Sequence, residues 1–313
     1  MLQEDLNSIK VIDGGFGVQA IDRSNLQIDG HRLWSCRLLL DDPELVVAIH
    51  RDFIDAGAEV IETNTYQANV DSFVEALPDS MTPSLAAEAL SSGVRLARRA
   101  VEESGCGRRV LVAGSCGPYG AAQCDLSEFT GDYCASMTEE DLARWHRPRV
   151  EALAAAGADL LAFDTLPSLR EARAVVQLLR EFPGLPAWLS FASRDGMKTC
   201  AGESLAEAAA DPLLMSCGSV FGLGVNCIVA PRNVARAARE LAPAAAEKTL
   251  LAYPNLGDYG GAEEPITEEL VSDWLQLGVR WIGGCCRVGP AEIARLARTV
   301  RRFRGDGAEE AGV

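Results

Sequence analysis

Three cysteines lie where they could hold a metal ion together. Cys227 ends one short apolar run, and the adjacent pair Cys285-Cys286 ends another, inside the sequence Gly283-Gly284-Cys285-Cys286. Three thiolate ligands leave one tetrahedral position of Zn²⁺ open, which is typical of a catalytic rather than a structural site, and soft thiolates favour zinc. The three cysteines therefore predict a zinc centre. The alternative is incidental, buried cysteines, because no Cys-x-x-Cys pair accompanies them.

Polar side chains end the other predicted strands. Asp13 could bind a polar group of a substrate, or it could simply start a turn. Asp164 is suited to hold an ammonium group, and the alternative is that it caps the helix that follows. The remaining strand-end residues are Thr63-Asn64, Ser115-Cys116, Thr165, Ser193, Asn226 and Asn255.

Six aromatic side chains fall in or near the loops that follow the predicted strands. They could surround a cationic substrate through cation–π contacts, or they could pack the loops. These residues are Phe16, Trp34, Tyr66, Tyr119, Phe129 and Tyr133. The three histidines, His31, His50 and His146, form no Ser-His-Asp arrangement, and we expect each of them at the surface or at a helix cap.

The composition excludes several classes of function. The chain has 313 residues, with 29 Lys+Arg against 45 Asp+Glu and a net charge of −16, which disfavours binding to nucleic-acid phosphates. No uncharged apolar run reaches the roughly 18 residues of a membrane span, and the first ten residues lack the apolar core of a signal peptide. We therefore expect a cytoplasmic protein whose ten cysteines stay reduced, with neither nucleic acid nor membrane as a partner.

Eight short apolar runs alternate with amphipathic helical patterns along the chain. The runs span 10–13, 59–64, 110–115, 159–164, 186–193, 220–227, 249–255 and 280–285, and the helical patterns include 43–56, 84–103, 138–156, 169–181, 232–241 and 267–277. Near-continuous apolar runs are typical of parallel strands buried on both faces. The alternation predicts an α/β protein with a single-domain (β/α)8 TIM-type barrel. A doubly wound open sheet is the alternative.

A barrel would bring all the strand ends together at one face, where barrel enzymes place their chemistry. Two loops at that face, residues 116–137 and 257–265, are long enough to be lids or specificity loops. We expect the barrel over residues 1–303 and a frayed, polar tail over residues 304–313.

The sequence resembles the homocysteine S-methyltransferases from about Val11 to Leu296. The matching stretches are Asp13-Gly14-Gly15, Glu62-Thr63-Asn64-Thr65-Tyr66-Gln67-Ala68, Gly114-Ser115-Cys116-Gly117-Pro118-Tyr119-Gly120, Gly224-Val225-Asn226-Cys227, Tyr253-Pro254-Asn255 and Gly283-Gly284-Cys285-Cys286-Arg287. Two further stretches, Leu33-Trp34-Ser35 and Gly131-Asp132-Tyr133, are more similar to the bacterial and plant branch that uses S-methylmethionine or S-adenosylmethionine than to the branch that uses betaine.

The resemblance implies a (β/α)8 barrel with one Zn²⁺ bound by Cys227, Cys285 and Cys286, and the thiol of homocysteine at the fourth position. It implies methyl transfer from a sulfonium donor, which gives methionine, with no catalytic side chain beyond the zinc site. The partners would be the small-molecule thiol and the sulfonium donor. The implied substrate-binding residues are Asp13, Gly14, Thr63, Ser115, Asn226 and Asp164, the last as the clamp for the amino group. The six aromatic residues named above are candidates for the donor site or the lid.

Three departures from the family pattern lie around the expected substrate site. Asp164 stands where glutamate is common, Val18 stands where many members have threonine, and Ala122–Ser127 replaces the usual Asp-Gly-Ser-Glu run. The missing methylene at Asp164 would shift the clamp by about 1.5 Å. Two alternatives therefore stay open: the same zinc barrel with another thiol or selenol as acceptor, and a catalytically silent protein that binds zinc or thiols. A cobalamin-dependent relative is disfavoured because one barrel fills the chain, and the sequence makes no prediction about the oligomeric state.

Overall fold

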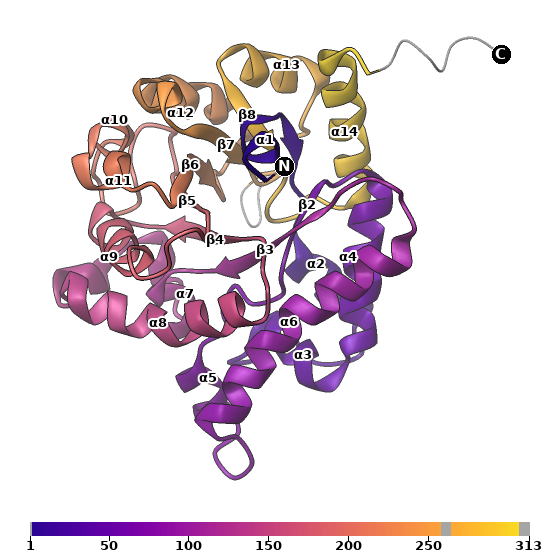
Figure 1. Ribbon diagram of the computed structural model, residues 1–313, viewed down its shortest axis with the longest axis vertical. Helices are drawn as coiled ribbons and strands as arrows, with labels where there is room; N and C mark the ends of the chain where they lie inside the picture. The colour runs from indigo at the N-terminus through magenta and orange to yellow at the C-terminus, as the bar shows by residue number, and fades with distance from the viewer. Residues whose placement is uncertain (1, 258–263, 307–313) are drawn as a thin grey trace.

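A closed barrel of parallel strands forms the centre of the protein. The computed structural model describes residues 2–257 and 264–306, and within them one sheet has the order β1-β8-β7-β6-β5-β4-β3-β2 with every pair parallel. A parallel bridge between Ile12 and Val60 joins β1 to β2 and closes the ring (Figure 1). The prediction of a (β/α)8 barrel is confirmed, and the open doubly wound sheet is excluded. The strands are β1 Lys10–Val11, β2 Val60–Glu62, β3 Leu111–Cys116, β4 Leu160–Leu166, β5 Ala187–Ala192, β6 Val220–Asn226, β7 Thr249–Tyr253 and β8 Val279–Ile282.

Helices surround the barrel, and the six predicted ones are present within a few residues of their expected ends. The α-helices are α1 Leu2–Asn7, α2 Phe16–Arg23, α3 Leu38–Asp41, α4 Pro43–Ala56, α5 Val70–Ala76, α6 Pro83–Ser104, α7 Tyr119–Gln123, α8 Glu139–Ala155, α9 Leu169–Leu179, α10 Leu205–Ala210, α11 Pro212–Ser216, α12 Val234–Leu241, α13 Glu268–Gln276 and α14 Pro290–Arg304. None of these helices is long and apolar enough to cross a membrane.

Local signals at the helix ends explain several of these boundaries. The side chain of Asp42 accepts a hydrogen bond from the Leu45 N–H and starts α4, and Thr138 begins α8 with a capping box. Gly57 follows α4 in the left-handed conformation, with φ +112°, and Gly278 follows α13 with φ +95°. Only glycine adopts these angles without strain, so the turn into the next strand is set locally.

The buried side chains form two layers. Inside the barrel, alternate strand residues such as Leu160, Trp188, Leu251 and Trp281 pack together, and the rings of Trp188 and Trp281 lie 5.6 Å apart. A larger cluster fills the space between the strands and the surrounding helices. Both faces of the strands are therefore buried, which is the reason their sequences read as continuous apolar runs.

Helix α1, which the sequence did not predict, covers the end of the barrel where the strands begin (Figure 1). Its Leu6 joins the interior cluster, and the Leu6 carbonyl accepts a hydrogen bond of 2.9 Å from the Thr249 hydroxyl. A cavity of about 960 Å³ lies at this end, beside Leu6, Lys248 and Arg280. Because barrel enzymes react at the opposite end, where the strands finish, this cavity is not the candidate site.

The chain beyond the last strand differs slightly from expectation. Helix α14 includes Arg304, the residue at which the tail was expected to begin, and the Arg304 guanidinium pairs with the Glu59 carboxylate at 2.7 Å. The rest of the expected tail, residues 307–313, lies outside the described residues, as do residues 258–263 of the second long loop.

Candidate metal and substrate site

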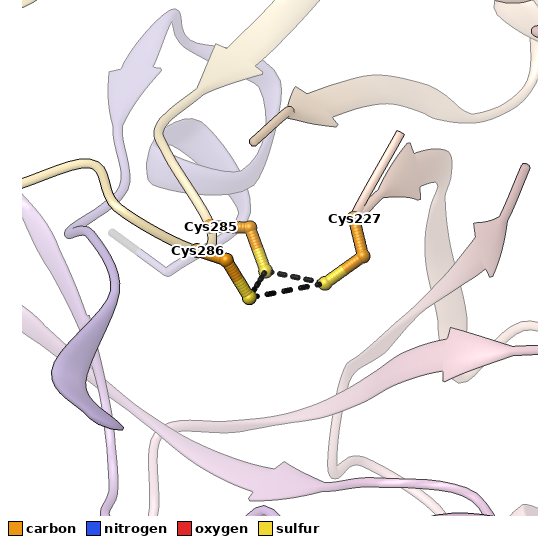
Figure 2. Close-up of side chains that lie close together, drawn as sticks. All are labelled: Cys227, Cys285 and Cys286. Carbon is orange, nitrogen blue, oxygen red and sulfur yellow. Dashed lines mark hydrogen bonds between the residues drawn. The ribbon is translucent and has the colours of Figure 1, made fainter. Parts of the chain in front are cut away.

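Three sulfur atoms converge at the mouth of the barrel, the end formed by the C-terminal ends of the strands. Cys227 directly follows β6 in a left-handed conformation with φ +46°. Cys285 and Cys286 lie in the loop after β8 and face Cys227 (Figure 2). The Sγ of Cys227 lies 2.6 Å from that of Cys285 and 4.0 Å from that of Cys286, and the Sγ atoms of the adjacent pair are 4.0 Å apart.

Neighbouring loops hold the Cys285-Cys286 loop in place. The Cys285 N–H donates to the Pro254 carbonyl at 2.9 Å, and the Cys286 N–H donates to Asn255 Oδ1 at 3.1 Å. Gly284 is needed because a Cβ there would collide with the side chain of Val288. The loop after β7 therefore fixes the backbone from which two of the three sulfurs project.

The cysteine cluster fits a tetrahedral metal ion with thiolate ligands. Zinc–sulfur bonds of about 2.3 Å in a tetrahedron separate the sulfurs by about 3.8 Å, close to two of the three observed separations. The hydrogen bonds with Cys285 and Cys286 raise the pKa of Cys227 well above its ordinary value, and burial adds to that rise. Three adjacent thiolates thus require a positive charge between them, which a divalent cation supplies. The structure fits a metal ion here without defining which one.

Asp164, at the end of β4, is buried and firmly oriented. Its Oδ2 accepts a hydrogen bond of 2.9 Å from the Ser115 hydroxyl, and its Oδ1 accepts bonds from Trp188 Nε1 at 3.2 Å and from the Tyr253 hydroxyl at 2.5 Å. Ser168, rather than Asp164, caps α9, so the helix-cap alternative for Asp164 is wrong. Burial raises the pKa of Asp164, and its hydrogen bonds oppose that rise.

Two further carboxyl groups lie beside Asp164. Asp13 is buried after β1, and its Oδ2 accepts a hydrogen bond of 3.0 Å from the backbone N–H of Glu62. Burial raises the pKa of Asp13 and of Glu62 well above their ordinary values, and repulsion by Asp164 raises both further. Three carboxyl groups that repel one another in a buried site favour a cation among them. The sequence did not assign Glu62 to the site, although it lies in a matching stretch.

Thr63, Ser115 and Asn226 have their polar groups occupied by the protein. The Thr63 hydroxyl accepts from the Ser115 N–H at 3.0 Å. Asn226 Oδ1 accepts from the Thr165 N–H at 2.7 Å, and its Nδ2 donates to the Thr165 hydroxyl at 2.8 Å. Thr165 has φ +61°, a strained conformation for a β-branched residue, and Asn226 stabilises it. These side chains hold the strand ends together, next to the carboxyl groups and the cysteines.

The aromatic candidates do not gather into one wall. Tyr66 is close enough to Cys227 and Cys285 for their charges to raise its pKa, although burial is the larger cause. Phe16 packs against the ring of His50 at 4.9 Å, and Trp34 covers Gly17 of α2. Of these residues, Tyr66 is the one placed beside the cysteine cluster.

Tyr119 and Tyr133 belong to a buried network at the base of the first long loop. Their rings lie 5.1 Å apart, and both residues donate to Glu171 of α9, Tyr119 through its N–H at 2.7 Å and Tyr133 through its hydroxyl. His146 donates from Nε2 to the same carboxylate at 2.9 Å and accepts from Arg149 at Nδ1. Glu171 therefore ties this loop to α8 and α9.

The expectation that the histidines lie at the surface or at helix caps is wrong for two of them. His50 and His146 are fully buried, and burial lowers their pKa values to about 3 and about 4 respectively. His50 packs against the ring of Phe16 of α2, and His146 bonds to Glu171 of α9, so no local pattern could reveal these contacts. His31 is partly exposed and accepts a hydrogen bond from the Leu33 N–H.

The middle of the first long loop forms two short 3₁₀ turns, η2 Ser127–Phe129 and η3 Asp132–Ala135. The Phe129 carbonyl accepts a hydrogen bond from Arg194 Nη2 at 3.3 Å, so this part of the loop reaches the segment after β5. Leu126, just before η2, is left-handed with φ +64°. We call residues 117–137 the lid.

Comparisons with known proteins find similar proteins over most of the chain. A family model described as homocysteine S-methyltransferase matches residues 10–300. The betaine-homocysteine S-methyltransferase of Drosophila melanogaster is 38% identical, over 95% of this chain and 95% of that protein. The homocysteine S-methyltransferase of Escherichia coli (strain K12) is 37% identical, over 93% of this chain and 95% of that protein. The metallated form of the Escherichia coli homocysteine methyltransferase MmuM superposes with a TM-score of 0.82 at 36% identity, and covers 95% of this chain and 98% of that one.

Proposed function

The chain belongs to the homocysteine S-methyltransferase family, and from that premise we propose how its site transfers a methyl group to homocysteine. The donor is a sulfonium compound, S-methylmethionine or S-adenosylmethionine. Cys227, Cys285 and Cys286 would hold a zinc ion, which would supply the positive charge that keeps the acceptor thiol deprotonated. The observation that carries the proposal is the convergence of these three sulfur atoms at the barrel mouth.

The chain contributes a set of thiolate ligands with one coordination position left for the substrate. Bound zinc would keep the homocysteine thiol, whose ordinary pKa is about 8.5, as a thiolate at neutral pH. The backbone contacts of Cys285 and Cys286 with Pro254 and Asn255 would hold two of these ligands in place. A cytoplasmic location, as the sequence predicts, would keep the three thiols reduced.

The three carboxyl groups orient the amino acid. Burial raises the pKa of Asp164, Asp13 and Glu62, and repulsion by Asp164 raises the pKa values of Asp13 and Glu62 further. An ammonium group beside the three carboxyl groups would offset both effects. Ser115, Trp188 and Tyr253 hold the Asp164 carboxylate in one orientation. Homocysteine would then lie with its amino group toward the β4 end and its sulfur toward the cysteines.

The methyl transfer is a direct displacement. The homocysteine sulfur forms a bond to the methyl carbon, the bond from that carbon to the donor sulfur breaks, and its electron pair converts the sulfonium into a neutral sulfide. The attacking sulfur is already deprotonated, so no side chain accepts a proton at this step. The protein accelerates the reaction chiefly by positioning two reactants in line.

Methionine formation from homocysteine tests the proposal. Protein loaded with zinc is assayed in parallel with S-methylmethionine, S-adenosylmethionine and betaine, because the Drosophila relative is named for betaine. We expect turnover with a sulfonium donor. Turnover with betaine alone would overturn the choice of donor. If no donor gave methionine on protein that had bound metal, homocysteine would be wrong as acceptor and another thiol or a selenol would replace it.

A further inference from the structure

The lid contains a buried carboxylate, one oxygen of which has no hydrogen-bond partner in the part of the chain that the structure describes. Glu128 lies in η2 and is 5% exposed. Its Oε2 has no hydrogen-bond partner among the described residues. A buried carboxylate is unfavourable unless a cation or hydrogen-bond donors compensate for its lost hydration. We therefore expect a ligand to bind at the unpartnered oxygen.

The groups around Glu128 carry negative charge. Asp125 and Cys286 both repel its carboxylate. The negative charge of Glu128 in turn disfavours ionisation of the Tyr66 hydroxyl. Tyr66 is the aromatic residue beside Cys227 and Cys285. The η2 turn contacts β4, the strand that carries Asp164, so Glu128 lies in the part of the lid that packs against the barrel mouth. Arg194, which lies beside the same segment, donates to the carbonyl oxygen of Phe129.

The lid backbone fixes the position of this side chain. The Phe129 N–H donates to the Leu126 carbonyl at 3.0 Å, and the Gly131 N–H donates to the Ser127 carbonyl at 2.8 Å. Gly120 lies so close to the η2 turn that a Cβ there would collide with the backbone nitrogen of Glu128. The backbone that carries Glu128 is thus held in place before any ligand arrives.

We propose that Glu128 binds the positive charge of the methyl donor and so determines donor specificity. The inference rests on the proposed function, in which a cationic donor must approach the acceptor sulfur at the cysteine cluster. A cation at this point would pair with the buried, unpartnered oxygen of Glu128. The cation is either the sulfonium itself or the α-ammonium group of S-methylmethionine.

Substitution Glu128→Gln tests this role because it removes the charge and keeps the size of the side chain. Asp125→Asn is the matched control: it removes one negative charge from the same lid, and an asparagine oxygen can still accept the bond from the Ser127 N–H that Asp125 Oδ1 accepts at 2.9 Å. Loss of a charged hydrogen bond corresponds to a roughly 10- to 100-fold weaker interaction. We expect the KM for S-methylmethionine to rise by this factor in E128Q, while the KM for homocysteine stays within about twofold. In D125N both constants should stay near those of the wild type.

A second donor separates the two possible cations. Dimethylsulfonioacetate carries a sulfonium but no amino group. If its KM also rises in E128Q, Glu128 binds the sulfonium, and if only S-methylmethionine is affected, Glu128 binds the ammonium. An unchanged donor KM in E128Q, or an equal rise in D125N, would overturn the proposal.

Failure of the proposed function would give a different result. Wild-type protein would then make no methionine from any donor. Calorimetric titration of S-methylmethionine into metal-loaded wild-type and E128Q protein would still decide the role of Glu128. Weaker binding to E128Q would support that role, and equal binding, or none to the wild type, would contradict it.

Discussion

Gly15 lies directly against the backbone of Cys285. A Cβ at Gly15 would stand 2.6 Å from the Cys285 carbonyl oxygen, and the Gly15 N–H donates to the Val288 carbonyl at 2.9 Å. The loop after β1, which carries Asp13, therefore packs without a gap against the loop that carries two of the three cysteines. The proposed amino-acid site and the proposed metal site share one rigid wall.

This contact predicts that Gly15→Ala weakens metal binding. The methyl group would meet backbone rather than a flexible side chain, so the Cys285 loop must move, and overpacking of this kind costs about 1–3 kcal/mol. We expect lower zinc occupancy after dialysis and a lower melting temperature. Gly218→Ala is the control, because a Cβ there has no atom within 4 Å and its φ is not positive. Full zinc occupancy in the Gly15 variant would show that the two loops move independently.

Cys285→Ser should remove most of the bound zinc and abolish methyl transfer, since a hydroxyl is a poor zinc ligand beside thiolates. Metal content by mass spectrometry and methionine formation are measured on the same preparation. Cys106→Ser serves as the control, because Cys106 is a half-buried cysteine that does not belong to the cluster. A Cys285 variant that kept both zinc and activity would remove Cys285 from the ligand set.

The sequence anticipated the barrel and the cysteine cluster because both depend on local patterns. Strands buried on both faces must read as apolar runs, and in a barrel the residues after such runs meet at one face. Cys227 and Cys285 are 58 positions apart in the sequence. Cys227 nevertheless directly follows β6, and Cys285 lies close to the end of β8. The topology alone therefore brings them together.

The partners of buried polar groups could not be anticipated in this way. His146 is kept neutral by its burial and by the charge of Arg149, although Glu171, on another helix, accepts a hydrogen bond from its Nε2 and opposes that effect. Glu62 lies at the barrel mouth beside Asp13, and Glu128 is brought there by the packing of the lid that carries it. Neither position follows from residue spacing. Helix α1 has six residues, too few for a helical period to be visible. These features are fixed by tertiary packing.

Asp164→Asn should weaken homocysteine binding and leave the metal in place. The substitution removes the charge that would pair with the ammonium group, so we expect the KM for homocysteine to rise about 10- to 100-fold, as for other lost charged hydrogen bonds. Because burial already raises the pKa of Asp164, loss of its charge should not lower the melting temperature of the free protein. Asp132→Asn, at an exposed position in the lid, is the control. An unchanged KM would place the ammonium group elsewhere.

His146 should make the stability of the protein sensitive to mild acid. Its pKa is about 4 in the folded protein and about 6.5 in the unfolded chain, so between these values the unfolded chain binds more protons. Stability is therefore full above about pH 6.5 and falls as the pH falls toward 4, by about 2 kcal/mol between pH 7.5 and 5 for this one group.

Urea unfolding of the wild type and of His146→Gln at pH 7.5 and pH 5 measures this contribution. Glutamine can still donate toward Glu171 and accept from Arg149, but it does not titrate, so the variant should lose about 2 kcal/mol less than the wild type over the same pH interval. His31→Gln, at a partly exposed histidine, should follow the wild type closely. An equal loss in H146Q and in the wild type would mean that His146 keeps an ordinary pKa, and that the link between the lid and α9 does not depend on its neutral form.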